Sequence, residues 1–145
     1  MEKSTYSGRQ VNNYVYFAFY GDAYNPEQIT NTLGLNPTTV KHKKDPVPVR
    51  TSWKLQVTSG SSPNFKTSLE ELIATLTPLI EEINTLKSEL SLETKLMFVM
   101  DIDIDPDASM PYFALNHKSI QFLYQTGTSV DFDLYKADTK GLILR

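Results

Sequence analysis

The chain has 145 residues, no cysteine and a formal net charge of −3, and 40% of its residues are hydrophobic. This length suits one domain with a sizeable core, and the lack of cysteine excludes disulfides, thiol nucleophiles and thiolate metal ligands. The mild charge argues against a nucleic-acid partner. The N-terminus has no apolar core of signal-peptide length, and no window approaches about 18 uninterrupted apolar residues, so we expect no membrane span. We therefore expect a cytoplasmic protein.

The first elements are an arm, a strand and a helix. Residues 1–12 are polar and aperiodic, and we expect them to form a flexible N-terminal arm. A strand is predicted over residues 14–21, because Val15, Phe17 and Phe19 alternate with tyrosine and alanine. Residues 25–34, NPEQITNTLG, carry the signals of a short helix: a capping asparagine, a proline in the first turn and a terminal glycine.

Two strands are predicted in the next part of the chain. Residues 38–44, TTVKHKK, suit a short edge strand, since its alternating lysines discourage pairing with another sheet edge. Residues 51–57, TSWKLQV, alternate in the same way and place Trp53 on the apolar face. A flexible loop rich in serine and glycine follows.

The longest predicted element is an amphipathic helix from Leu69 to about Leu90, capped by Ser68. Pro78 lies inside its apolar stripe, and because proline removes one helical hydrogen bond we expect a kink or a restart there. The segment KLMFVMDIDID, residues 95–105, then predicts a long strand.

A short strand at 111–115, a third helix at 116–127 and a closing strand at 129–136 complete the order, followed by a C-terminal tail at 137–145. We expect the helix to turn Ile120, Leu123 and Tyr124 inward, and the strand to turn Val130, Phe132 and Leu134 inward. The pattern predicts an α+β two-layer sandwich over residues 13–136. One mixed or antiparallel sheet of five to six strands carries three helices on one face, one of them long and kinked.

Four aspartates at every second position, in MDIDIDPD, pose the main chemical question. Asp101, Asp103 and Asp105 match the start of a calcium-binding loop, but its sixth position is Pro106 instead of glycine and its twelfth is Tyr112 instead of glutamate. A strand explains the same spacing, with hydrocarbon side chains inward and carboxylates outward. Solvation, neutralisation by lysine, a basic partner or a bound divalent cation would each accommodate that acidic face.

A candidate binding surface follows from this alternation. The closing strand repeats it with two further aspartates, and the first strand would add tyrosines, which suit protein recognition because they combine apolar area with a polar tip. The candidate binding residues are Tyr14, Tyr16, Tyr20, Asp101, Asp103, Asp105, Asp131 and Asp133. His42 and His117 are expected at the surface, and without a phosphate-binding glycine motif we expect no cofactor and no resident metal.

The chain also resembles a bacterial family known as domain of unknown function 4279. The resemblance lies in the aromatic strand ending at Gly21-Asp22, the helix ending in Leu33-Gly34-Leu35, Asn36-Pro37-Thr38, Trp53, and the segment from Gly127 to Tyr135. It implies a small intracellular α+β domain and supplies no site residues. Some such families resemble immunity proteins of bacterial toxin systems.

These observations lead to two hypotheses about function. The first is a non-enzymatic, immunity-like protein that binds a basic protein partner through its acidic, tyrosine-bearing sheet face, as a monomer or homodimer. The alternative is a metal-dependent hydrolase or small-ligand binder that uses the same aspartates.

Overall fold

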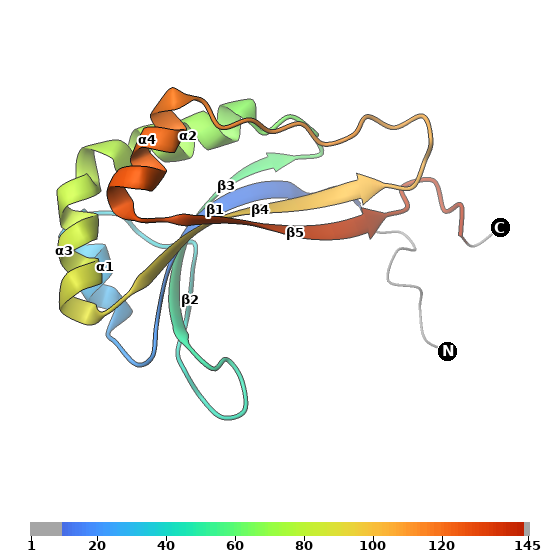
Figure 1. The fold of residues 1–145 in the computed structure, drawn as a ribbon. Helices are drawn as coiled ribbons and strands as arrows, with labels where there is room; N and C mark the ends of the chain where they lie inside the picture. Colours follow the sequence, from blue (N-terminus) through green and yellow to red (C-terminus); the bar gives the residue numbers. More distant parts are fainter. Residues whose placement is uncertain (1–9, 144–145) are drawn as a thin grey trace.

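A computed structural model describes residues 10–143 and shows one sheet with all its helices on one face (Figure 1). The elements are β1 Asn13–Gly21, α1 Pro26–Leu33, β2 Thr39–Lys41, β3 Thr51–Gly60, α2 Lys66–Leu76, the 3₁₀ turn η1 Thr77–Leu79, α3 Ile80–Leu90, β4 Glu93–Asp103, α4 His117–Thr126 and β5 Ser129–Ala137. The five strands lie in the order β2-β3-β1-β4-β5. Only the β4–β5 pair is parallel, so the predicted mixed sheet and α+β fold are confirmed.

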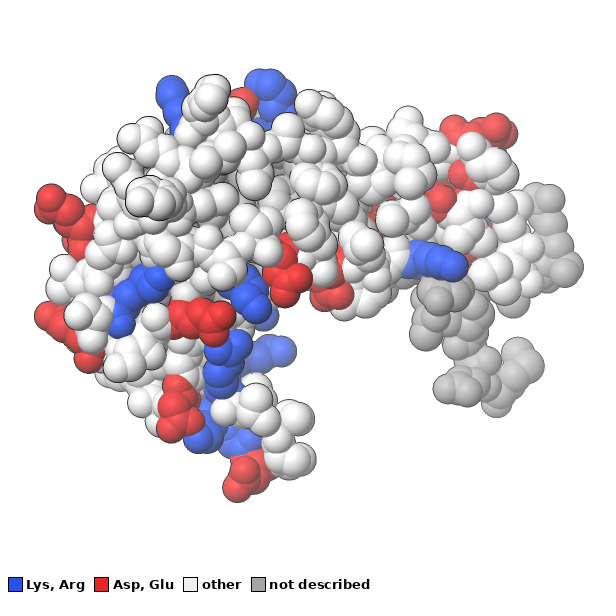
Figure 2. All heavy atoms as spheres, in the orientation of Figure 1, with Lys and Arg blue, Asp and Glu red and all other residues white. Residues whose placement is uncertain are grey.

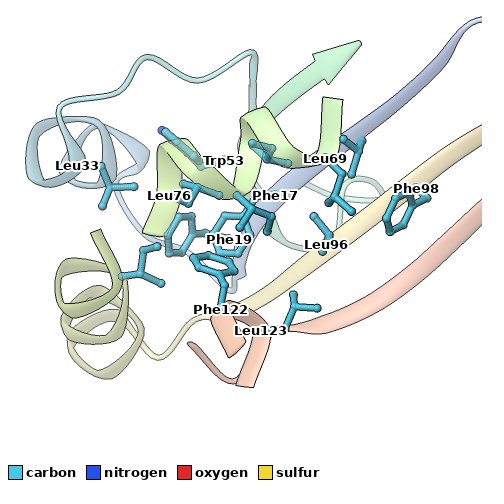
Figure 3. Packing of buried hydrophobic residues seen from close by; sticks show 14 of the residues in the cluster. Phe17, Phe19, Leu33, Trp53, Leu69, Leu76, Leu96, Phe98, Phe122 and Leu123 are labelled. Carbon is cyan, nitrogen blue, oxygen red and sulfur yellow. The ribbon is translucent and has the colours of Figure 1, made fainter. Parts of the chain in front are cut away.

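The core lies between this sheet and the helices, and aromatic rings fill much of it (Figure 3). Phe17 and Phe19 project from the central strand β1, as their alternation predicted, and both are fully buried. Trp53 packs edge-on against Phe19 with ring centroids 5.6 Å apart, and its indole nitrogen donates a hydrogen bond to the Thr30 hydroxyl at 3.0 Å. That bond satisfies the polar atom of a side chain otherwise surrounded by hydrocarbon.

Local sequence signals set the ends of α1 and α4 as predicted. The Asn25 side chain accepts the amide of Glu27, and the Asn116 side chain accepts the amide of Ser119 at 2.9 Å. Each helix ends at a glycine with a left-handed backbone, which residues with a Cβ rarely adopt. The capping residues therefore determine where these two helices begin and end.

The long helix confirms the predicted interruption but not the predicted start. The turn η1 around Pro78 separates α2 from α3, and the apolar stripe continues on both sides. The helix begins at Lys66, whose amide is accepted by the Asn64 side chain at 2.9 Å. Ser68 is not the cap: it lies inside the first turn, is buried, and donates its hydroxyl proton to the Phe65 carbonyl.

Two predictions about the C-terminal third are wrong, and a third is confirmed only in direction. Residues 111–115 form no strand; Tyr112 makes only an isolated bridge with Asn64. Helix α4 buries Phe122 and Leu123 and leaves Ile120 and Tyr124 52% and 86% exposed, because α2 and α3 pack against the other side of its stripe. The residues of β5 point inward as predicted, with Phe132 stacked on the buried Phe98, but this side is half-open: Phe132 is 43% and Leu134 58% exposed, since β5 is an edge strand.

Candidate functional site

The face of the sheet opposite the helices carries the candidate residues of β1. Strand pairing places Tyr16 between Gln56 of β3 and Met97 of β4, and it places Ala18 between Lys54 and Lys95. Within residues 10–143 every helix lies on the other side of the sheet (Figure 1). The tyrosines thus reach the outer face by strand alternation alone, as the sequence predicted.

The middle of this face is a small apolar cluster. Tyr16, Ala18 and Val99 are buried, and Tyr14, Tyr20 and Met97 pack around them. The Tyr14 and Tyr16 rings stack at 6.4 Å, and the hydroxyls of Tyr16 and Tyr20 lie 3.4 Å apart. Burial raises the pKa of the Tyr16 phenol well above its ordinary value.

Cations border the cluster on one side. The Lys54 ammonium lies 4.7 Å from the centre of the Tyr16 ring, and the Arg50 guanidinium lies 4.6 Å from that of Tyr20. Burial, and then repulsion from Lys41, lowers the pKa of Lys54. Figure 2 shows Lys and Arg side chains gathered on the hollowed lower side, beside the hairpin between β2 and β3.

Acids border the cluster on the other side, at β5. Asp131 lies across from Met97 and Asp133 across from Val99, so neither faces another carboxylate. The Lys95 ammonium is 3.6 Å from the Asp131 carboxylate, and the Tyr135 hydroxyl donates to Asp133 at 2.9 Å. With their neighbours across the cluster, these residues form what we name the open sheet face: Tyr14, Tyr16, Tyr20, Arg50, Lys54, Lys95, Asp131 and Asp133.

The other three predicted aspartates do not extend this surface. Asp101 is only 3% exposed and accepts the amide of Asn12 at 2.8 Å. Asp103 accepts the hydroxyl of Thr139, which lowers the pKa of that carboxyl. Asp105 lies beyond the end of β4 and pairs with Lys140 at 2.8 Å, which lowers its pKa in the same way.

These contacts change the interpretation of the MDIDIDPD segment. Its carboxylates hold the segments before β1 and after β5 against the end of β4, instead of forming an open acidic surface. The expected acidic face is therefore acidic only along β5 and basic on its opposite side. Sequence alternation gave the side of the sheet correctly but not the long-range partners of each carboxylate.

A separate hollow of about 970 Å³ lies in the helical layer and is lined by residues of α2, η1 and α4. Ile73, Ala74 and Pro78 line one wall, and His117 and Phe122 line the other. No pattern in the sequence had predicted this groove. Its signal was the small Ala74 ahead of the helix-interrupting Pro78, which together leave space beside a neighbouring helix.

Among residues 10–143, no three or more histidine or acidic side chains are grouped as metal ligands. In the same range, no helix has both the length and the apolar character needed to cross a bilayer. His42 and His117 are exposed, as predicted.

Comparisons with known proteins identify one family. A protein-family model matches residues 9–137, and that family is described as a domain of unknown function (DUF4279). The match spans every strand and helix of the sandwich, from β1 to the end of β5. No curated protein and no solved structure matches the chain.

Proposed function

Since the chain belongs to the DUF4279 family, whose name assigns no activity, we propose from its geometry that it is a non-enzymatic protein-binding domain. The partner docks on the open sheet face, and basic groups of that partner meet Asp131 and Asp133. Immunity-like inhibition of a basic protein in the bacterial cytoplasm, as the sequence predicts, is the form of binding that we propose.

One observation carries this proposal: the centre of the sheet face that no helix covers within residues 10–143 is apolar and aromatic. The solvated face of a sheet ordinarily carries polar residues. Here its centre holds Tyr14, Tyr16, Tyr20, Met97 and Val99. Tyrosine is enriched where proteins bind one another, because it offers a large contact area at a small cost in conformational entropy.

The contacts around these rings favour a rigid docking surface. Lys54 and Arg50 lie over the rings of Tyr16 and Tyr20, and such cation–π contacts contribute about 0.5–1 kcal/mol each at exposed sites. A surface already ordered before binding loses less side-chain entropy when a partner arrives. The cationic and anionic flanks would then orient the partner, and its basic groups would approach β5.

The alternative of a metal-dependent hydrolase or a small-ligand site at the aspartates receives less support. Asp103 and Asp105 are engaged with Thr139 and Lys140, and Asp101 is buried against Asn12. The helical groove lies on the far side of the sheet from the tyrosines. The carboxylates and the helical groove thus do not combine into one site.

Photo-crosslinking tests where a partner docks. A photoreactive phenylalanine replaces Tyr20 on the open sheet face in one variant and Tyr124 on the helical layer in the other, which is a matched aromatic control. In the native host, we expect a specific crosslinked protein only from position 20. Crosslinking from position 124 alone would move the binding surface to the helices and reject the proposal.

Charge reversal tests how the partner is oriented. The variant Asp131→Lys/Asp133→Lys should lose the partner identified by crosslinking, while Glu81→Lys/Glu89→Lys, on exposed positions of α3, should retain it. Both variants change the net charge equally, so a difference between them reports on the site and not on total charge. Equal capture by both would remove the role that we assign to the β5 acids.

A further inference from the structure

The sheet has two outer strands, and their exposed residues suggest a second kind of contact. β2 and β5 lie at opposite ends of the strand order, and no other strand within residues 10–143 pairs with their outer edges. All three residues of β2 are exposed, as is β5 from Asp131 to Leu134. Such edges present unpaired backbone groups that readily accept another strand.

The charges on these two edges are opposite, and they lie on the same face of the sheet. Lys41 of β2 lies across from Ser52, which pairs with Tyr20, so Lys41 projects to the side of the open sheet face. Asp131 and Asp133 of β5 project to that side as well. Repulsion from Lys41 helps to lower the pKa of Lys54, so the basic edge carries cations that repel each other.

This arrangement blocks two kinds of edge pairing and favours a third. Two copies of β5 would bring aspartates together, and two copies of β2 would bring lysines together. The same charge sign on both edges would disfavour every pairing between copies. Opposite signs protect only against the symmetric pairings and leave β5 complementary to β2 of another copy.

Strand direction and side-chain alternation fit that pairing. β2 and β1 are both antiparallel to β3, so they run in the same direction. β1 is antiparallel to β4, which is parallel to β5, so β2 runs antiparallel to β5 within the sheet. If a second copy is moved sideways in the same orientation, its β2 lies beside β5 of the first copy and runs antiparallel to it. When its Lys41 lies across from Asp133, its exposed Val40 lies across from the exposed Leu134 on the helix-facing side.

A shift of one residue would destroy the match. A shift in one direction would place Lys41 across from Phe132 and Val40 across from Asp133, and a shift in the other would place Lys41 across from Leu134 and Val40 across from Tyr135, since the side-chain period of a strand is two. The alternation of charge and hydrocarbon on the two edges thus selects an in-phase register. Lys43, which pairs with Asp22 in the isolated chain, falls across from Asp131 in that register.

We propose that this protein self-associates head to tail, with β5 of one copy accepting β2 of the next in an antiparallel edge pairing. The contact is heterologous, so each copy retains one free edge of each kind and assemblies can exceed a dimer. It is weak and sensitive to salt, because β2 is short and the charge pairs are exposed. The inference needs only the protein itself and is tested without the partner, although both contacts use Asp131 and Asp133.

Sedimentation velocity of the purified chain tests the proposal from micromolar to millimolar concentration, at low and at high ionic strength. We expect the weight-average mass to rise with concentration beyond that of a dimer at low salt and to fall when salt is added. Lys41→Glu and Asp133→Lys should each weaken association about tenfold, since an attractive cross-strand pair becomes a repulsive one. Circular dichroism confirms that each variant folds.

Charge exchange provides the decisive control. The double variant Lys41→Glu/Asp133→Lys, and an equimolar mixture of the two single variants, should both regain association, whereas Lys118→Glu on α4 should not alter it. Hydrogen exchange at high concentration should protect β5 amides. A chain that stays monomeric under all conditions, single variants that associate like the original, or a dimer insensitive to Lys41→Glu would each overturn the proposal.

Discussion

Replacing Phe98 with alanine should reduce the free energy of unfolding by about 3–5 kcal/mol, the usual cost of truncating a buried aromatic ring. Phe98 is fully buried in the middle of β4. Its ring centroid lies 5.5 Å from that of Phe65, 5.3 Å from that of Phe113 and 5.5 Å from that of Phe132. The substitution therefore removes hydrocarbon contacts to three rings at once and leaves a cavity.

Phe132→Ala is the matched comparison. Phe132 touches Phe98 and Phe113, but it is 43% exposed, so its removal should cost only about 1–2 kcal/mol. Urea unfolding measures both variants, followed by circular dichroism and by the fluorescence of Trp53, the single tryptophan, which is fully buried. The measurements are made at low protein concentration, where edge pairing between copies is negligible.

The comparison can refute the reasoning in two ways. If Phe132→Ala costs as much as Phe98→Ala, the inward side of β5 is covered in solution and β5 is not an open edge. If Phe98→Ala costs less than about 1 kcal/mol, the ring does not occupy the core position described here. A changed slope of the unfolding free energy against urea would show instead that the variant alters the compactness of one state.

Three further predictions concern individual contacts. Trp53→Phe should lower the free energy of unfolding by about 1–3 kcal/mol, because the hydrogen bond to the Thr30 hydroxyl is lost. Urea unfolding followed by circular dichroism measures this loss. Equal stability in Thr30→Val and Thr30→Val/Trp53→Phe would contradict any further role of the indole. Lys87→Met should lower the melting temperature and reduce the free energy of unfolding by about 1 kcal/mol, because the Lys87 ammonium donates hydrogen bonds to the carbonyls of Thr126 and Gly127 at the end of α4. An unchanged melting temperature would show that this link between α3 and α4 is not stabilising. Asp103 and Asp105 have folded-state pKa values below their ordinary ones, so they contribute stability above about pH 4 that is lost as pH falls through the folded values. The urea midpoint should therefore fall less between pH 7 and pH 3 in Asp103→Asn/Asp105→Asn than in the original chain, and an identical fall would contradict this assignment.

Helix α4 shows where sequence reasoning reached its limit. Its residues contain two overlapping stripes, one through Ile120 and Tyr124 and one through Phe122 and Thr126, and both include Leu123. Helical periodicity cannot choose between them, because each stripe repeats every three to four residues. The neighbouring helices α2 and α3 chose the second stripe, and Tyr124 remains 86% exposed.

The aspartates show the same limit in the sheet. Alternation correctly sent Asp131 and Asp133 to the outer face, because the direction of a side chain on a strand depends only on its neighbours in sequence. It did not reveal that Asp101 is buried against Asn12, which lies 89 residues earlier in the chain. The parallel pairing of β4 with β5, and thus the position of β5 as an open edge, also depended on contacts far apart in sequence.

The sequence by itself determined the ends of α1 and α4, the interruption at Pro78 and the face to which each residue of β1 points, because capping, proline geometry and strand alternation act over a few neighbouring residues. Only the tertiary structure decided the strand order, which carboxylates are buried and which flank of the open sheet face is acidic. These properties arise when residues distant in the chain compete for the same neighbours, and that competition is resolved only when the whole chain packs.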